Sequence, residues 1–294
     1  MPSRRQAVAG ALASAWLAAC GGEGDRRGEE GPRTGAPPRI VSISPSATES
    51  VFALGRGGWL VGRSTYCDEP PEALSIPEVG GFADPSLERI VALSPTLVVG
   101  ERGPAGPRLV EALEGRGIAT YFPPIGSLAD IEAFLGGLGE RLDARGAAAT
   151  AIGRIHEATT EVTSSQAGLP RPRVLFLFDF QPIVAAGPGS FPDELVTRAN
   201  ATNVVSAGGI YPRLGAEGVL ALDPDVIVDG SAPGAYAEDP VALLRAIPGL
   251  SALRAVRESR VARLEGTAAL RPGPRIGEGL RQLARVIRTL AAPR

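Results

Sequence analysis

The sequence is poor in the side chains that carry most enzyme chemistry. It contains one histidine, His156, and two cysteines, Cys20 and Cys67. A zinc site built from histidines is therefore excluded, and a Ser-His-Asp triad would have to use His156. The cysteine spacing matches no zinc or redox motif, and neither a P-loop nor a Gly-x-Ser-x-Gly motif occurs. We therefore expect no catalytic residue, no cofactor and no metal site.

A cationic surface and a membrane-spanning run are also missing. The formal net charge is -2 over 294 residues, so we expect no polyanionic partner such as a nucleic acid. No segment has the roughly 20 consecutive apolar residues that cross a bilayer. Hydrophobic residues make up 44% and charged residues 21% of the chain, which is typical of globular proteins long enough to form two domains.

The N-terminus has the pattern of an export signal. In residues 1–20, two arginines precede a short apolar stretch that ends in Leu17-Ala18-Ala19-Cys20. This tetrapeptide resembles a bacterial lipobox, whose cysteine receives a diacylglycerol; the alternative is a chance cysteine after an ordinary signal peptide. Positions 3–5 also resemble a twin-arginine signal, so the export route stays open. Residues 21–38, rich in Gly, Pro and charge, predict a flexible tether.

Beyond the tether, short apolar runs alternate with helical patterns in two stretches. Residues 39–144 and 170–294 each predict an α/β lobe with a mainly parallel sheet. Between them, residues 145–169 lack proline and have apolar residues at helical spacing, which predicts a long connecting helix. The expected strands are 39–44, 60–62, 97–100, 118–122, 173–178, 183–187, 226–230 and 261–265; the expected helices outside the connector include 48–54, 107–114, 127–142 and 276–290.

The two lobes share an internal similarity. Residues 87–99 align with residues 216–228, because both read Glu-x-[IV]-[VL]-Ala-Leu-x-Pro followed by a β-branched run. A common helix-to-strand join explains the apolar match. It does not explain why an aromatic residue precedes the glutamate at the same interval in both halves, Phe82 before Glu88 and Tyr211 before Glu217. We interpret the similarity as a structural duplication.

A duplicated α/β chain predicts a ligand cleft between its lobes, formed by loops at the carboxyl ends of the strands. Phe82 and Tyr211 are then placed to face each other across a flat ligand. Asp179 and Gln181 follow a strand and precede a proline, so they are further candidates. Glu88 and Glu217 suit two basic pockets on a two-fold partner; the alternative is ordinary helix N-terminal charge.

At these residues the sequence resembles the helical-backbone, or class III, substrate-binding proteins of ABC importers for vitamin B12, haem and iron–siderophores, and is most similar to the vitamin B12-binding branch. The resemblance spans residues 39–292. Its motifs are Arg39-Ile-Val-Ser-Ile-Ser-Pro45, Tyr66-Cys-Asp-Glu-Pro-Pro71, the segment from Leu87 to Pro95, and Pro274-Arg275-Ile276. It implies two Rossmann-like lobes, a rigid connecting helix and little hinge motion.

The resemblance also implies roles for particular residues. Tyr66, Phe82 and Tyr211 line the cleft, and Arg271 lies near the corrin side groups. Glu88 and Glu217 dock onto arginines of a dimeric permease. The vitamin B12-binding pattern has Trp where this chain has Phe82 and Tyr211, which leaves other ring or chelate ligands open.

We therefore expect an exported, lipid-anchored, monomeric protein that captures cobalamin or a related corrinoid and delivers it to an ABC permease and its ATPase. The expected location is the periplasm or the outer face of the cytoplasmic membrane. Haem or a ferric siderophore is the alternative ligand, and an exported α/β enzyme is a further alternative. Tyr66 would pack on the ring or, with haem, bind iron through its phenolate. Cys67 is interpreted as a buried structural thiol, with a ligand contact as the alternative.

Overall fold

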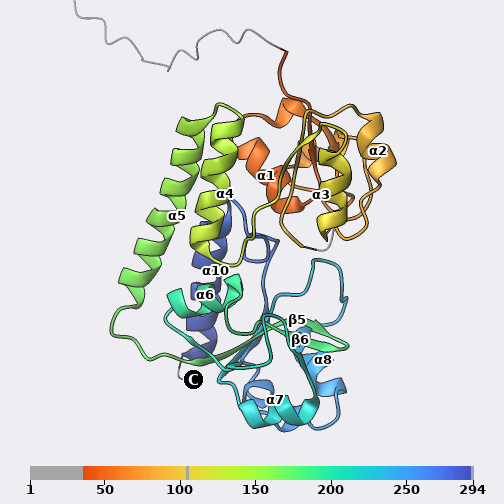
Figure 1. Cartoon of the computed structure of the whole chain (residues 1–294). Coiled ribbons are helices and arrows are strands. Elements are labelled where there is room, and N and C mark those ends of the chain that lie inside the picture. The colour runs from red at the N-terminus through yellow and green to blue at the C-terminus, as the bar shows by residue number, and fades with distance from the viewer. Residues whose placement is uncertain (1–35, 104–105, 293–294) are drawn as a thin grey trace, which may run out of the picture. The chain divides into compact units, whose positions relative to one another are not determined.

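Two β-sheets organise the chain in the computed structural model, which describes residues 36–103 and 106–292 (Figure 1). The first sheet has the order β2-β1-β3-β4, and its neighbouring strands are all parallel. Its strands are β1 (Ile40–Ser42), β2 (Leu60–Arg63), β3 (Leu97–Val99) and β4 (Ala119–Tyr121). They are short, and β1 and β3 are buried along their whole length and apolar except for Ser42, as expected for the central strands of a sheet covered on both faces.

The second sheet has the order β10-β9-β5-β6-β8, with β7 paired to β5. β5 is parallel to β7 and β9, whereas β6 and β8 add an antiparallel extension. The strands are β5 (Arg173–Phe180), β6 (Ile183–Ala185), β7 (Thr202–Asn203), β8 (Arg213–Leu214), β9 (Val226–Asp229) and β10 (Val261–Arg263). All eight strands expected from the sequence form; the two-residue strands β7 and β8 were not predicted.

The internal similarity reappears as a repeated topology. The order β2-β1-β3-β4 of the first sheet matches β7-β5-β9-β10 of the second. The pairing register is also the same, since Ile40 lies opposite Leu97 and Val174 lies opposite Val226.

The helices that precede the two aligned strands end in the same way. α2 (Leu87–Ala92) leads to β3, and α7 (Ala216–Leu222) leads to β9. Ser94 and Asp223 then adopt left-handed backbone conformations, with φ of 46° and 37°. Each stands directly before a proline, which disfavours helical backbone at that position. The predicted duplication is therefore present in the backbone as well as in the residue pattern.

The remaining helices surround the two sheets. α1 (Pro45–Ala53) begins earlier than predicted, because Ser44 caps it by accepting a hydrogen bond from the Ala47 amide and Pro45 occupies its first position. The connecting helix is confirmed as α5 (Arg145–Gln166). The others are α3 (Gly106–Glu114), α4 (Leu128–Arg141), α6 (Phe191–Arg198), α8 (Pro240–Ala246), α9 (Arg254–Arg257) and α10 (Ile276–Ala291), with short 3-10 turns at Gly57–Trp59, Pro71–Ser75 and Leu250–Ala252.

One of three hydrophobic core clusters among the described residues extends across both halves of the chain, whereas each of the other two lies within one half. α5 packs against both α4 and α10, and the three helices run beside one another in Figure 1. The same buried cluster contains Ile40 of β1, Phe134 of α4, Ile155 of α5, Phe176 of β5 and Leu283 of α10. Because this core is continuous, moving one sheet against the other would disrupt close packing. The lobes are thus held by shared packing as well as by a connecting helix.

The predicted signal sequence and the lipidation site Cys20 lie outside the described residues, as does nearly all of the tether. Within the part of the chain that the structure covers, no helix combines the length and apolar character needed to cross a bilayer.

Candidate ligand-binding site

A cavity of about 520 Å³ lies where loops from both halves of the chain meet. The first half contributes the start of α1, the loop that contains Phe82 and the residues after β3. The second half contributes the end of β5, the loop before β8 and the segment before α10. The predicted cleft residues Phe82, Tyr211 and Arg271 all line it. These side chains come from positions far apart in the sequence, and the fold brings them together.

Two aromatic residues that the second half contributes to this cavity, Phe178 and Tyr211, pack against each other. Tyr211 is 48% exposed, and its ring packs edge-on against Phe178 with the centroids 5.3 Å apart. Phe178 in turn contacts Phe176, with centroids 5.2 Å apart. Tyr211 is therefore held by a ring that is anchored in the core. Phe178 was not predicted, although alternation along β5 from Val174 through Phe176 points to it.

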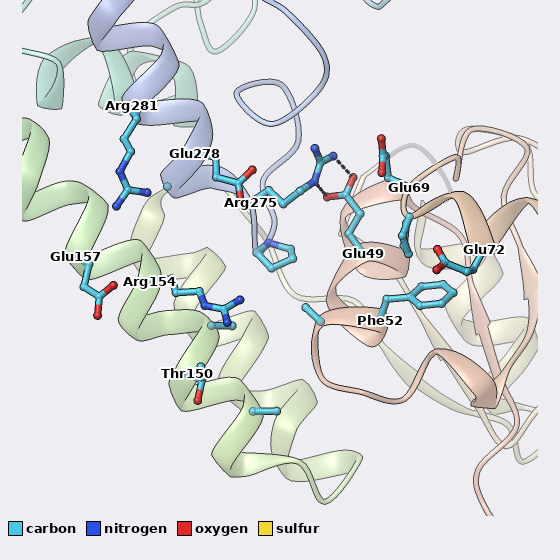
Figure 2. A pocket seen from close by; sticks show the side chains of 16 residues that line it. Glu49, Phe52, Glu69, Glu72, Thr150, Arg154, Glu157, Arg275, Glu278 and Arg281 are labelled. Carbon is cyan, nitrogen blue, oxygen red and sulfur yellow. Dashed lines mark hydrogen bonds and ion pairs between the residues drawn. The ribbon is translucent and has the colours of Figure 1, made fainter.

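Arg271 is held by an ion-pair network that joins the two halves. Its guanidinium lies 3.0 Å from the Glu49 carboxylate and 2.6 Å from that of Asp68, and it donates to the Tyr66 carbonyl at 3.4 Å. Arg275 donates two hydrogen bonds of 2.8 Å to Glu49 (Figure 2). The Glu49 side chain is only 4% exposed. Arg271 thus reaches the cavity already oriented and with its charge largely balanced.

Asp68 shows the strength of this pairing. Burial alone would raise the pKa of the Asp68 carboxyl, but the hydrogen bond and positive charge of Arg271 outweigh burial and lower that pKa. Asp68 therefore stays ionised at neutral pH and remains a partner for Arg271.

Glu101 is a further cavity residue that was not predicted. It follows β3 and accepts a hydrogen bond from the Ser46 hydroxyl. Burial raises the pKa of its carboxyl, although hydrogen bonds from Ser46 and Ser44 oppose that rise. Burial also raises the pKa of Tyr211, and the charge of Glu101 adds to this effect. The available signal was a charged residue just after a buried strand, where ligand loops of parallel sheets lie.

Tyr66 and Cys67 occupy the loop after β2. Tyr66 is 62% exposed and does not line the cavity, although its ring lies against Gly81, next to Phe82. Cys67 is fully buried, and burial raises the pKa of its thiol. The structure therefore agrees with the interpretation of Cys67 as a buried thiol rather than as a ligand contact.

Asp179 and Gln181 do not reach the cavity, in contrast to their prediction. The Asp179 carboxylate accepts hydrogen bonds from the Tyr236 hydroxyl and from the amides of Phe180 and Gln181. Gln181 is exposed at the turn between β5 and β6. Phe178 lines the cavity, and the pairing of β5 with β6 is irregular between Leu177 and Asp179, so regular alternation along the strand does not extend to Asp179. Position after a strand was therefore not enough to place these side chains.

Glu88 and Glu217 occupy equivalent places on the two halves. Both are exposed in the first turn of their helices, α2 and α7. His156 lies exposed on α5 with its Nε2 atom 2.9 Å from a Glu132 oxygen. Across the described residues, no three His, Cys, Asp or Glu side chains are grouped as metal ligands.

A second groove of about 750 Å³ lies between α1, α5 and α10 (Figure 2). Its labelled charged side chains include Glu69 and Glu72 on one side and Arg154 and Arg281 on the other. Phe52 is its one aromatic lining residue, and none of the predicted ligand residues lines it. The smaller cavity, with rings from both halves, is therefore the better candidate for binding a flat ring.

Comparisons with known proteins agree with this geometry. Residues 40–268 match the family model described as periplasmic binding protein. The vitamin B12-binding protein of Salmonella typhimurium is 32% identical over 194 residues, which cover 66% of this chain and 72% of that protein.

Solved structures show the same fold. A periplasmic heme-binding protein in complex with two hemes has a TM-score of 0.79 and 28% identity, covering 87% of this chain and all of the other. The periplasmic vitamin B12 binding protein of Vibrio cholerae has a TM-score of 0.74 and 25% identity, covering 87% and 99% of the two chains. The chain therefore belongs to the periplasmic binding proteins, and it is an exported substrate-binding component of an ABC importer rather than an enzyme.

Proposed function

We propose that this protein captures cobalamin or a related corrinoid and delivers it to its permease. The observation that carries the proposal is the cavity with Phe82 from one half and Tyr211 from the other. Rings contributed by both halves offer flat apolar contact to a planar macrocycle at a low cost in side-chain entropy. The identity to vitamin B12-binding proteins, 32% for the Salmonella typhimurium protein, supports this choice of ligand.

The cavity also has polar groups that suit the rim of such a ligand. Arg271 and Glu101 lie among its lining residues, and the hydroxyl of Ser46 is beside Glu101. A few placed polar groups in a mainly apolar pocket fix the orientation of a bound molecule. A corrin ring carries amide groups on its edge that both donate and accept hydrogen bonds.

Haem is the second candidate ligand, and the structural comparison favours it. The solved structure with a TM-score of 0.79 is a heme-binding protein. A phenolate is one ligand that haem iron accepts. Tyr66 is an exposed tyrosine in the loop after β2, outside the cavity lining. In this alternative, Tyr66 moves toward the cavity when the ligand binds.

The proposal also covers how the protein delivers its ligand to the permease and where the protein is located. Glu88 and Glu217, exposed on equivalent helices, are the proposed contacts with a dimeric permease. Diacylglycerol on Cys20 would retain the mature chain at the membrane surface, with residues 21–38 as a tether. The protein acts as a monomer in this proposal, with its own two halves presenting the matched carboxylates.

Titration of the purified protein with cyanocobalamin and with haemin tests the ligand proposal. Cyanocobalamin is expected to bind and to shift its visible absorbance. Phe82→Ala and Tyr211→Ala should each weaken binding about tenfold or more, because each removes a ring contact of about 1.4 kcal/mol or above. Phe52→Ala, which removes a ring from the other groove, is the control and should leave the affinity unchanged. Tight haemin binding without cyanocobalamin binding would instead support the second candidate.

A further inference from the structure

We propose that Glu101 is the residue that selects the ligand by charge, favouring a ring whose edge carries uncharged amides over one whose edge carries carboxylates. This inference rests on the proposed function of the cavity and specifies the chemistry of its ligand. Glu101 belongs to the first half of the chain, and it lines the same cavity as Tyr211 and Arg271.

The carboxylate of Glu101 is fixed in position by the fold. The residue follows the buried strand β3, and hydrogen bonds hold the backbone on either side of it, from the Gly100 amide to the Tyr121 carbonyl at 3.1 Å and from the Arg102 amide to the Pro123 carbonyl at 2.9 Å. On the other side, Ser46 in the first turn of α1 donates its hydroxyl to Glu101, and the Ser44 and Ser46 hydroxyls are 3.3 Å apart. Ser44 also caps α1. A ligand therefore meets an acceptor that is already oriented.

The other charged groups around the cavity do not cancel this negative charge. Arg271 lines the cavity, but it is already paired with Glu49 and Asp68. Arg102 also lines the cavity and is exposed, so solvent and salt screen its charge. Tyr211, the titratable group facing Glu101 from the second half, is neutral at ordinary pH, as tyrosine normally is, and burial raises its pKa further. The partly buried Glu101 carboxylate thus makes the largest unscreened contribution to the electrostatic potential in the cavity.

Amides and carboxylates interact with such a group in opposite ways. An amide N–H donates a hydrogen bond to a carboxylate, and a hydrogen bond to a charged acceptor is stronger than one between neutral groups. A ligand carboxylate placed there meets a like charge in a partly desolvated site. Cobalamin has primary amides around its corrin ring, whereas haem has two propionates. Burial raises the pKa of Glu101, so discrimination should weaken as pH falls and the side chain becomes neutral.

The test compares ligands that differ at one peripheral group, which is a neutral amide in one ligand and a carboxylate in the other. Cyanocobalamin and its separated monocarboxylic acid isomers, each with one peripheral amide hydrolysed, are titrated against the wild-type protein and Glu101→Gln from pH 5 to pH 8. We expect the wild type to bind at least one isomer about tenfold more weakly than cyanocobalamin at pH 8, the order expected for nearby like charges with screening. In Glu101→Gln the ratio of the dissociation constant of that isomer to that of cyanocobalamin should fall to about threefold or less. The ratio should also lose most of its pH dependence.

Two further variants keep the result interpretable. Glu72→Gln removes the same charge from an exposed site in the other groove and should retain the wild-type ratio at every pH. Ser46→Ala removes the donor that holds the Glu101 carboxylate and should give an intermediate ratio. This variant provides the test if Glu101→Gln folds poorly.

The outcomes separate this inference from the proposed function. If wild type and Glu101→Gln both bind cyanocobalamin, with the same isomer ratio and the same pH profile, the role of Glu101 is overturned. The corrinoid proposal is then unaffected. Absence of cyanocobalamin binding, together with equal haemin binding by both proteins, would overturn both the corrinoid proposal and this inference.

Discussion

Asp179 illustrates, at the scale of single residues, how a predicted ligand residue can have a structural role. The Tyr236 hydroxyl donates a hydrogen bond to its carboxylate and is the main cause of a lowered Asp179 pKa. A carboxyl whose pKa is lower in the folded state stabilises the fold above its unfolded pKa. That stabilisation is lost as pH falls through about 4 and below.

Tyr236→Phe should therefore lower the melting temperature more at pH 7 than at pH 3. A net loss of about 1 kcal/mol corresponds to a decrease of roughly 2–4 °C at this chain length. Thermal unfolding at the two pH values measures the difference. Tyr121→Phe is the control, because the Tyr121 hydroxyl contacts only main-chain carbonyls of α4 in its hydrogen bonds; its effect should be the same at both pH values. An equal loss at pH 3 and pH 7 for Tyr236→Phe would contradict the role of Asp179 ionisation.

The repeat led to two residues that the structure places at one cavity, and their contact with a ligand stays a prediction. Phe82 and Tyr211 were found from the duplication, and both line the cavity. Glu101 and Phe178 also line the cavity. Glu101 was missed because it lies outside the repeated segment 87–99, and Phe178 was missed because it lies inside an apolar strand. Arg271 came from the family resemblance alone, because its partner Glu49 is 222 positions away in the sequence.

At the scale of helices and strands, two glycines in α10 allow neighbouring segments to pack closely against that helix. A Cβ atom on Gly279 would lie 2.5 Å from the backbone of Ala269, and one on Gly277 would lie 2.9 Å from the Ala158 side chain in α5. Backbone cannot give way as a flexible side chain can, so the contact at Gly279 is the more restrictive one.

Gly279→Ala should destabilise the protein by about 2 kcal/mol or more, through overpacking against backbone. Gly153→Ala in α5 is the matched control, because a Cβ at Gly153 meets nothing within 4 Å. That change should stabilise the protein by about 0.5–1 kcal/mol, since alanine is the better helix former. Denaturant unfolding of both variants measures the two effects. Stabilisation or neutrality in Gly279→Ala would show that α10 can shift away from the segment before it.

Elements with a strong periodic pattern were predicted, whereas short elements without one were not. α5, the long connecting helix, is amphipathic and free of proline, so its extent was correct to within a few residues. α6 and α8 were missed because each has only about two turns. Their apolar residues are too few to establish a helical period.

At the scale of the whole molecule, the matched halves suggest how the protein contacts its permease. Glu88 and Glu217 are exposed at equivalent places, α2 and α7, outside the cavity lining. Removing their charges should therefore affect delivery without affecting capture. Two basic pockets on a two-fold partner would each lose a charge-assisted contact.

The double variant Glu88→Gln and Glu217→Gln should bind ligand within about twofold of wild type, yet support less than about one tenth of its uptake. Uptake is measured with the permease and ATPase reconstituted in vesicles. The control is the pair Glu72→Gln and Glu265→Gln, which removes one exposed charge from each half at other positions. Full uptake by the first double variant, or an equal loss in the control, would contradict the docking proposal.

By itself, the sequence determined the repeated α/β pattern, the connecting helix and the matched aromatic and acidic residues, because these depend on local periodicity and on comparison of one segment with another. The tertiary structure decided which side chains share a cavity. Glu101 meets Ser46, and Arg271 meets Glu49 and Asp68, only because the strand ends and α1 converge in space. It also decided that one core cluster spans both halves while each half keeps a second cluster of its own, since such packing depends on contacts between residues distant in the chain.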